Sequence, residues 1–224
     1  MSDQDEHRPE FQPFEFFTEA HLVEVTGISA KNLNELLDNL HRVSGSVIYC
    51  HTFKTMLEHH FITEGFRNDF ALWIMDSIGD EELGERLSSI DLIDYVTLRD
   101  YRMKMIEIIK DHLSVYPEAG DRPAKQGNPF FFCEANTYFM TTYRVANTLE
   151  EFANHLRRSS RNSIFFHFIE SRLRVGATIN DFSVWMIQSL GMNELGRKIN
   201  ALDPYKYSLD DLKDQICELV ETEL

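Results

Sequence analysis

The chain has 224 residues, of which 43% are hydrophobic and 12% are aromatic. This composition is sufficient for a sizeable core and excludes a disordered or low-complexity chain. The 37 acidic residues outnumber the 22 basic ones and give a formal net charge of −15. Such a charge argues against general nucleic-acid binding and against docking on an anionic membrane, because both require a basic protein surface.

The N-terminal tail, residues 1–13, is polar and acidic and lacks the basic and apolar segments of a signal peptide. No apolar run approaches the roughly 18 residues that a membrane-spanning helix needs. The three cysteines, Cys50, Cys133 and Cys217, are widely spaced and form no zinc-binding pattern. We therefore expect a cytoplasmic protein without a membrane segment, a disulfide framework, a metal site or a cofactor.

Each half of the chain then begins with a short apolar segment. Residues 14–17 and 130–133 are interpreted either as short extended strands or as apolar plugs. Residues 21–26 read as a helical turn that Gly27 closes. Their counterpart in the second half, residues 137–142, is richer in β-branched and aromatic side chains, which favour strands.

Apolar residues at helical spacing follow in both halves. Ser29 is expected to cap the first helix, and Asn68 or Asp69 the third, which Gly79 ends. The predicted helices of the first half cover residues 29–40, 46–60, 68–78 and 81–89, with a fifth that begins at residue 97. Those of the second half include residues 148–156 and 162–174 and a last helix that begins at residue 208.

The two halves are copies of one sequence. Phe14-x-Phe16 returns as Phe130-x-Phe132, a shift of 116 residues that also aligns His51 with His167. Further along the chain the shift drops to 112, and Asn68-Asp69-Phe70-x-x-Trp73 aligns with Asn180-Asp181-Phe182-x-x-Trp185. Internal duplication is the simplest explanation. The expected domains are repeat 1 at residues 14–113, a Pro/Gly-rich linker at 114–129 and repeat 2 at 130–224.

Together these patterns predict a mainly α-helical fold. We expect two tandem, internally duplicated helical bundles, with at most a minor pair of short strands.

The ordered motifs of repeat 1 resemble those of an uncharacterised bacterial family of unknown function. They read Phe14-x-Phe16, Thr26-Gly27-x-x-Ala30-x-Asn32-Leu33-x-Glu35-Leu36-Leu37, Ser46-x-Ile48-x-x-His51 and Asn68-Asp69-Phe70-x-x-Trp73. The resemblance implies a soluble, mostly helical protein and brings no assigned activity. Repeat 2 departs from the motifs, since Tyr143 replaces Gly27 and Asn162 replaces Ser46. A family site is therefore expected in repeat 1.

His51 and His167 recur at one position of an apolar helix. Such a histidine could be a ligand or a proton carrier, but more often it is a buried side chain bonded to a backbone carbonyl or to a carboxylate of a facing helix. A metal site is weakly supported, because His51 and His59 lie ~12 Å apart along a helix, too far to share one ion.

The repeated Asn-Asp-Phe-x-x-Trp motif also has two readings. Asn68 and Asn180 are ordinary helix caps, whereas Asp69 and Asp181 could present a carboxylate into a cleft. The two tryptophans of the chain, Trp73 and Trp185, are most simply core anchors.

Charge is distributed unevenly along the chain, and the second repeat contains a local cluster of arginines. The cluster could bind an anion or an acidic partner, or it could be a solvated helix face. Its candidate residues are Arg157, Arg158, Arg161, Arg172 and Arg174.

No nucleophile motif, phosphate-binding glycine loop or zinc-protease motif is present. The leading hypothesis is therefore a non-catalytic interaction or regulatory protein that binds a protein partner or forms a homo-oligomer. The alternative is a small-molecule-binding protein or enzyme with a site near His51, Asp69 and Trp73. In that case His51 would carry protons, Asp69 would be its carboxylate partner and Trp73 an aromatic wall.

Overall fold

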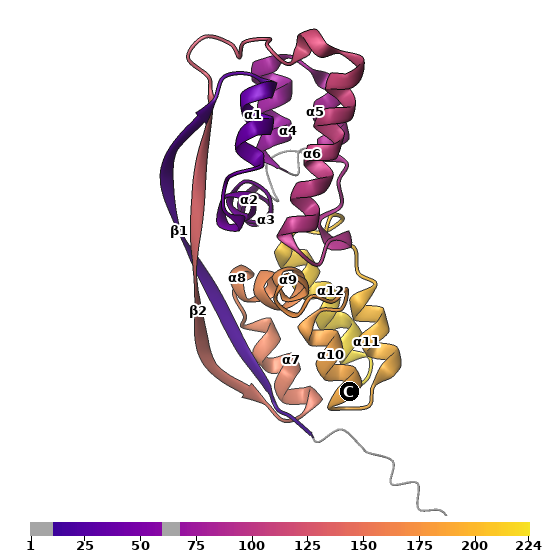
Figure 1. Cartoon of the computed structure of the whole chain (residues 1–224). Coiled ribbons are helices and arrows are strands. Elements are labelled where there is room, and N and C mark those ends of the chain that lie inside the picture. The colour runs from indigo at the N-terminus through magenta and orange to yellow at the C-terminus, as the bar shows by residue number, and fades with distance from the viewer. Residues whose placement is uncertain (1–10, 60–67) are drawn as a thin grey trace, which may run out of the picture. The chain divides into compact units, whose positions relative to one another are not determined.

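The computed structural model describes residues 11–59 and 68–224 (Figure 1). Two long strands, β1 (Phe14–Ala30) and β2 (Phe130–Ala146), pair as a two-stranded antiparallel sheet. The prediction of a mainly helical protein with at most short strands is therefore wrong, and the fold is a mixture of helices and sheet. The helical turn predicted at residues 21–26 is also wrong, because these residues lie within β1.

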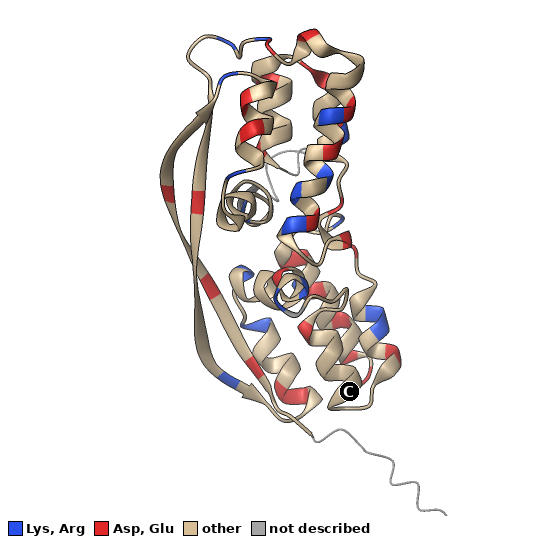
Figure 2. Ribbon diagram, viewed as in Figure 1, with Lys and Arg blue, Asp and Glu red and all other residues tan. Residues whose placement is uncertain are grey.

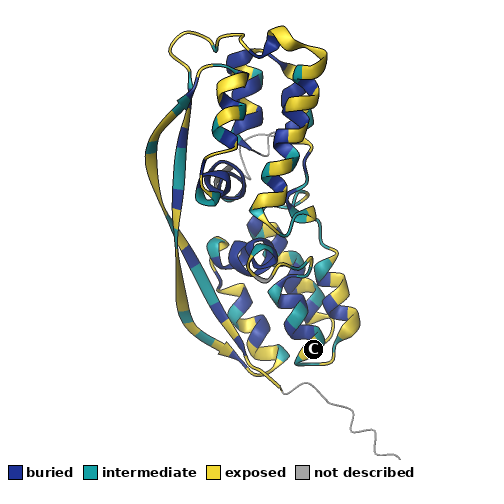
Figure 3. Cartoon of the chain, viewed as in Figure 1, coloured by how far each residue is buried: buried dark blue, intermediate teal, exposed yellow. Residues whose placement is uncertain are grey.

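The strands are longer than the short segments at residues 14–17 and 130–133 that were considered as strands, because most of their length lacks a buried face. Residues 22–25 of β1 and 138–141 of β2 are exposed in succession, so no alternation of apolar and polar residues marks them (Figure 3). Their pairing is with a segment more than 100 residues away in the sequence. Gly27 lies inside β1 with φ +78°, and the equivalent Tyr143 lies inside β2 with φ +58°.

The chain forms two compact units, and each strand passes from one unit into the other. The N-terminal unit consists of residues 20–138, and the C-terminal unit of residues 11–19 together with 139–224. Each unit thus contains the helices of one sequence repeat but strand segments from both repeats. Phe14 and Phe16 of repeat 1 belong to the unit built from the helices of repeat 2, and Phe130 and Phe132 belong to the other unit.

The N-terminal unit contains the helices of repeat 1. Their bounds are α1 (Leu33–Leu40), α2 (Gly45–His51), α3 (Phe53–His59), α4 (Asp69–Trp73), the π-helix η1 (Ile74–Ile78), α5 (Glu81–Ser88), the 3-10 helix η2 (Leu92–Asp94), α6 (Leu98–Val115) and the 3-10 helix η3 (Pro117–Ala119). Asn32, not Ser29, caps α1, and Gly79 ends η1 in the left-handed region, as predicted.

The C-terminal unit contains the helices of repeat 2. Their bounds are α7 (Leu149–Arg157), α8 (Arg161–Ile164), the π-helix η4 (Phe165–Glu170), α9 (Ser171–Val175), α10 (Asp181–Gln188), α11 (Asn193–Asn200) and α12 (Leu209–Glu221). Thr148 and Ser208 cap α7 and α12, which confirms both predicted helix starts.

The repeated Phe-x-Phe motif anchors each strand in a helical core. In the C-terminal unit the Phe14 ring lies 5.3 Å from the Phe152 ring and 5.5 Å from the Phe182 ring. In the N-terminal unit the Phe130 ring stacks on Phe70 at 4.9 Å. Each repeat therefore completes its aromatic core with a strand residue from the other repeat, a reciprocal exchange of strands within one chain.

Candidate functional site

His51 is the last residue of α2 and has two hydrogen-bond partners. Its Nδ1 atom lies 2.8 Å from Oδ2 of Asp69, the first residue of α4. Its Nε2 atom accepts the backbone N–H of Cys133 in β2 at 2.9 Å. The side chain is buried against the Phe70 and Phe130 rings. The structure thus brings the predicted pair His51 and Asp69 together, and adds a strand backbone as third member.

His167 repeats this arrangement in the C-terminal unit. Its Nδ1 atom lies 2.8 Å from Oδ2 of Asp181, and its Nε2 atom accepts the backbone N–H of Phe17 in β1 at 2.9 Å. Each histidine therefore ties the exchanged strand to two helices of the unit. We refer to these two sets, Asp69–His51–Cys133 and Asp181–His167–Phe17, as the histidine clamps.

The clamps define the tautomer of both imidazoles. Because Nε2 accepts a backbone N–H, the ring proton must be on Nδ1, which donates to the carboxylate. A second proton on Nε2 would face the strand N–H and break that bond. A proton carrier needs a nitrogen that can take up and release a proton. Here both nitrogens of each ring are hydrogen-bonded to other groups of this chain.

Burial of His167 favours the neutral imidazole, as does the hydrogen bond from the Phe17 N–H. Desolvation lowers the pKa of His167, while the hydrogen bond and charge of Asp181 raise it and the charge of Arg174 lowers it. The net direction is downward, so the neutral ring is favoured. This is the form in which Nε2 can accept the Phe17 N–H.

The two asparagines of the repeated motif are helix caps, as predicted. The Asn68 side chain accepts the Ala71 N–H at 2.8 Å, and the Asn180 side chain accepts the Ser183 N–H at 2.9 Å. Both asparagines are buried, and Asn68 also donates to the Leu87 carbonyl. The caps place Asp69 and Asp181 at the first helical position, from which each carboxylate reaches its histidine.

The two tryptophans are buried, and each indole holds the start of a strand segment. Nε1 of Trp73 donates to the Asn128 carbonyl at 2.8 Å, two residues before β2. Nε1 of Trp185 donates to the Gln12 carbonyl at 2.7 Å, two residues before β1. These contacts are equivalent in the two repeats. Buried indoles usually find such a partner, but its identity could not be read from the sequence.

The C-terminal unit also contains a buried carboxyl pair that no sequence pattern predicted. Glu19, in β1, is 1% exposed, and its carboxyl group shares a hydrogen bond with Glu170 of η4. Desolvation raises the pKa of Glu19, against the lowering effects of Glu170 and Arg174. The N-terminal unit has Ala135 and Lys54 at the two equivalent positions, so the pair belongs to the C-terminal unit only. Nothing in the local pattern of β1 marks Glu19 as buried.

Figure 2 shows where basic and acidic residues lie along the ribbon. The side chains of the predicted arginine cluster are largely engaged in internal contacts. Arg157 binds Glu221, and Arg161 binds Asp210. Arg174 binds Asp181 at 2.7 Å and lies 3.8 Å from the Phe166 ring centroid. Buried Arg172 donates to Thr178 and Asn200 at 3.4 Å. Arg158 is exposed and makes no ion pair within the described part of the chain.

Within residues 11–59 and 68–224, no group of three or more His, Cys, Asp or Glu side chains is arranged to hold a metal ion. The side chain of His59 and the whole of His60 lie outside the described residues. In the same described part, no helix has both the length and the apolar character needed to cross a membrane.

The comparison with known families gives a match over almost the whole chain. Residues 11–221 match the model of a family of unknown function, DUF5752. The chain belongs to DUF5752. This confirms membership of a family without an assigned function, whereas the bacterial source and the role of the motifs as family hallmarks stay predictions.

One solved structure has a fold similar to that of this DUF5752 chain. OrfY from Thermoproteus tenax is similar to this chain with a TM-score of 0.81 and 26% sequence identity, over 96% of each chain. No curated protein matches the chain.

Proposed function

We propose that this DUF5752 protein is a non-catalytic interaction protein that binds a protein partner through its exposed strands. The observation that carries the proposal is the run of large apolar side chains that β1 and β2 present to solvent. Large apolar side chains exposed in this number on one pair of strands are typical of a binding surface. In the N-terminal unit these residues are Leu22, Val23, Val25, Ile28, Phe131 and Tyr138, which we call the strand surface.

The histidine clamps support the non-catalytic reading. The alternative, a small-molecule or catalytic site near His51, Asp69 and Trp73, needs polar atoms that are available to a substrate. Both His51 nitrogens and the Trp73 indole N–H are instead bonded to this chain. The same contacts recur in the second repeat, which is expected if they maintain the fold.

The test places a photoreactive amino acid at one surface position of the full chain, in the cells that naturally express it. Val25, which is 72% exposed on β1, is the test position, and Met103, which is 50% exposed on α6, is the matched control. A partner on the strand surface yields a discrete cross-linked species from Val25 that is absent from Met103. Equal cross-linking patterns at the two positions would contradict the proposal.

A further inference from the structure

Within the described part of the chain, no strand pairs with the outer edge of β1 in the N-terminal unit. The sheet of the described chain contains only β1 and β2, so β1 pairs with a strand along one edge, and no strand of the described residues pairs with its other edge. Unpaired strand edges are templates on which another extended segment can pair.

This edge also lacks the usual protection against added strands. Natural edge strands are commonly protected by lysine, by proline or by a bulge. The sequence of β1 contains no lysine, arginine or proline. Its one glycine, Gly27, interrupts the regular backbone only after residue 26. Residues 22–26 therefore form an unprotected stretch long enough for a short third strand.

The side chains along this stretch are apolar on both faces. Leu22, Val23 and Val25 are all exposed, and consecutive strand residues point to opposite faces of a sheet. A third strand would therefore find apolar neighbours above and below the plane of the sheet. The backbone groups supply affinity in this mode of recognition, and the alternate side chains supply specificity.

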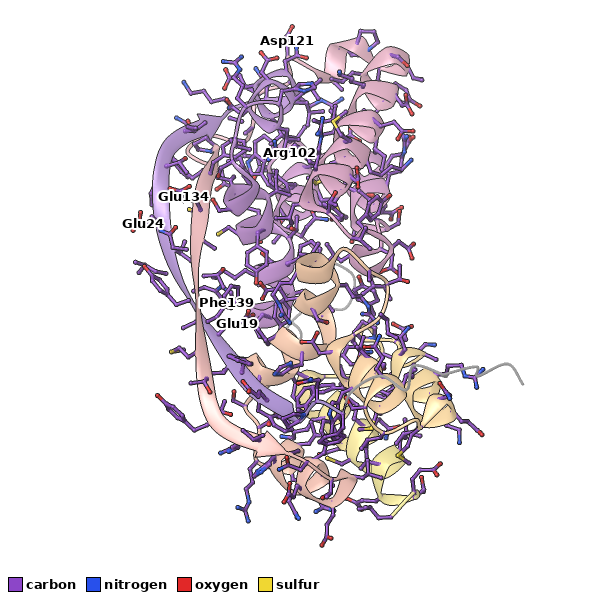
Figure 4. All side chains as sticks on the ribbon, turned by 60° about the horizontal axis from the view of Figure 1, so that its bottom comes forward. Glu19, Glu24, Arg102, Asp121, Glu134 and Phe139 are labelled. Atoms are coloured by element: carbon purple, nitrogen blue, oxygen red, sulfur yellow. The ribbon has the colours of Figure 1, made fainter. Side chains whose placement is uncertain are left out.

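Charge selects among the segments that could occupy the edge. Glu24 and Glu134, labelled in Figure 4, are the acidic residues of the sheet within the N-terminal unit. Neither strand has a Lys or Arg within that unit. Like charges opposite each other destabilise a strand pair, and opposite charges stabilise it. A second copy would bring Glu24 and a net charge of −15 against the same acidic edge. A basic partner is favoured instead.

From these observations we infer that residues 22–26 of β1 bind an extended partner segment in which apolar and basic side chains alternate, added as a third strand. The inference rests on the proposed function and specifies the chemistry of the partner. It differs from a purely electrostatic contact because it requires backbone hydrogen bonds along β1.

The test uses three fluorescent, end-capped peptides and the full chain. The first alternates lysine with valine, the second alternates glutamate with valine, and the third is the first with every second backbone nitrogen methylated. We expect the lysine peptide to bind at least about tenfold more tightly than either of the others, since one lacks the charge and the other lacks N–H donors. Hydrogen exchange should slow at amides within residues 22–26 when the lysine peptide binds.

Two matched variants locate the binding site. Val25→Lys puts a basic side chain on the edge and should weaken binding of the lysine peptide by about tenfold. Val145→Lys makes the same change at an exposed position of β2 in the C-terminal unit and should leave the affinity unchanged within about twofold. Thermal unfolding of both variants checks that the fold is retained.

The possible failures are distinguishable. Equal binding of the methylated and unmethylated lysine peptides would overturn strand addition, but would leave the proposed function intact if Val25 still cross-links a partner. Equal binding of the lysine and glutamate peptides would overturn the charge argument. Concentration-dependent dimerisation of the chain that Val25→Lys abolishes would make a second copy the occupant and contradict the inference.

Discussion

Replacing His167 with alanine should destabilise the C-terminal unit and release β1 from it. The side chain is 2% exposed and lies among the Phe14, Phe166 and Phe182 rings, so its truncation leaves a cavity that costs about 2 kcal/mol. The Phe17 N–H also loses its acceptor, which costs about 1–3 kcal/mol where water cannot replace it. We therefore expect a loss of about 3–5 kcal/mol in the free energy of unfolding.

Urea denaturation measures the total loss, and hydrogen exchange measures where it occurs. The Phe17 amide should exchange faster in His167→Ala than in the wild type, because its hydrogen bond is gone. His41→Ala is the control, since His41 is exposed at the end of α1 and its loss should cost less than about 0.5 kcal/mol. A loss below about 1 kcal/mol in His167→Ala, with unchanged exchange at Phe17, would refute the clamp.

Three further predictions concern pH, the tryptophans and the strand backbone. Since burial lowers the pKa of His167 below its unfolded value of about 6.5, the unfolded chain binds a proton first as the pH falls. The contribution of neutral His167 to the free energy of unfolding should therefore be fully present above about pH 6.5 and decline below that pH. The decline due to this group is at most about 1.4 kcal/mol per pH unit, and urea titrations from pH 8 to 5 would measure it. Trp185→Phe keeps an aromatic ring but loses the bond to the Gln12 carbonyl, and should lower the unfolding free energy by about 1 kcal/mol in urea denaturation. Gly27→Ala should lower the melting temperature, because an alanine at φ +78° costs about 1 kcal/mol of backbone energy. A Cβ at this position meets no other atom, so no steric clash adds to that cost. Tyr143→Gly at the equivalent position should raise it or leave it unchanged, and a marked fall would contradict this view of the backbone.

The features predicted correctly from the sequence were local or repeated. The caps at Asn68 and Asn180 were predictable because an asparagine before an apolar helix has one common use. The burial of Trp73 and Trp185 was predicted from their place in a repeated apolar motif. The repetition of His51 as His167 follows from the similarity of the two halves of the sequence. A carboxylate partner for each histidine was anticipated as one of several alternatives.

The long strands and their exchange were not predictable in the same way. β1 and β2 pair with each other over a separation of more than 100 residues, and their middle parts bury neither face. Strand propensity depends strongly on such tertiary context. The partners of His51 and His167 are backbone N–H groups, which every residue type except proline carries, so no sequence pattern could identify Cys133 or Phe17.

Because of the strand exchange, the two sequence repeats are not two independent folding units. Each Phe-x-Phe motif serves the helices of the other repeat, with Thr26 donating to the Phe132 carbonyl and Thr142 to the Phe16 carbonyl. Neither repeat, taken alone, contains the strand segment that fills its own aromatic core. This arrangement explains why the clamp and tryptophan contacts recur in both units.

Nitrogen NMR of the imidazoles, with detection of couplings across hydrogen bonds, tests the central claim most directly. The account predicts that at neutral pH both His51 and His167 carry their proton on Nδ1, and that Nε2 couples to the Cys133 and Phe17 amides respectively. A proton on Nε2, or the absence of coupling to those two amides, would contradict the clamps and the exchange of strands that they hold.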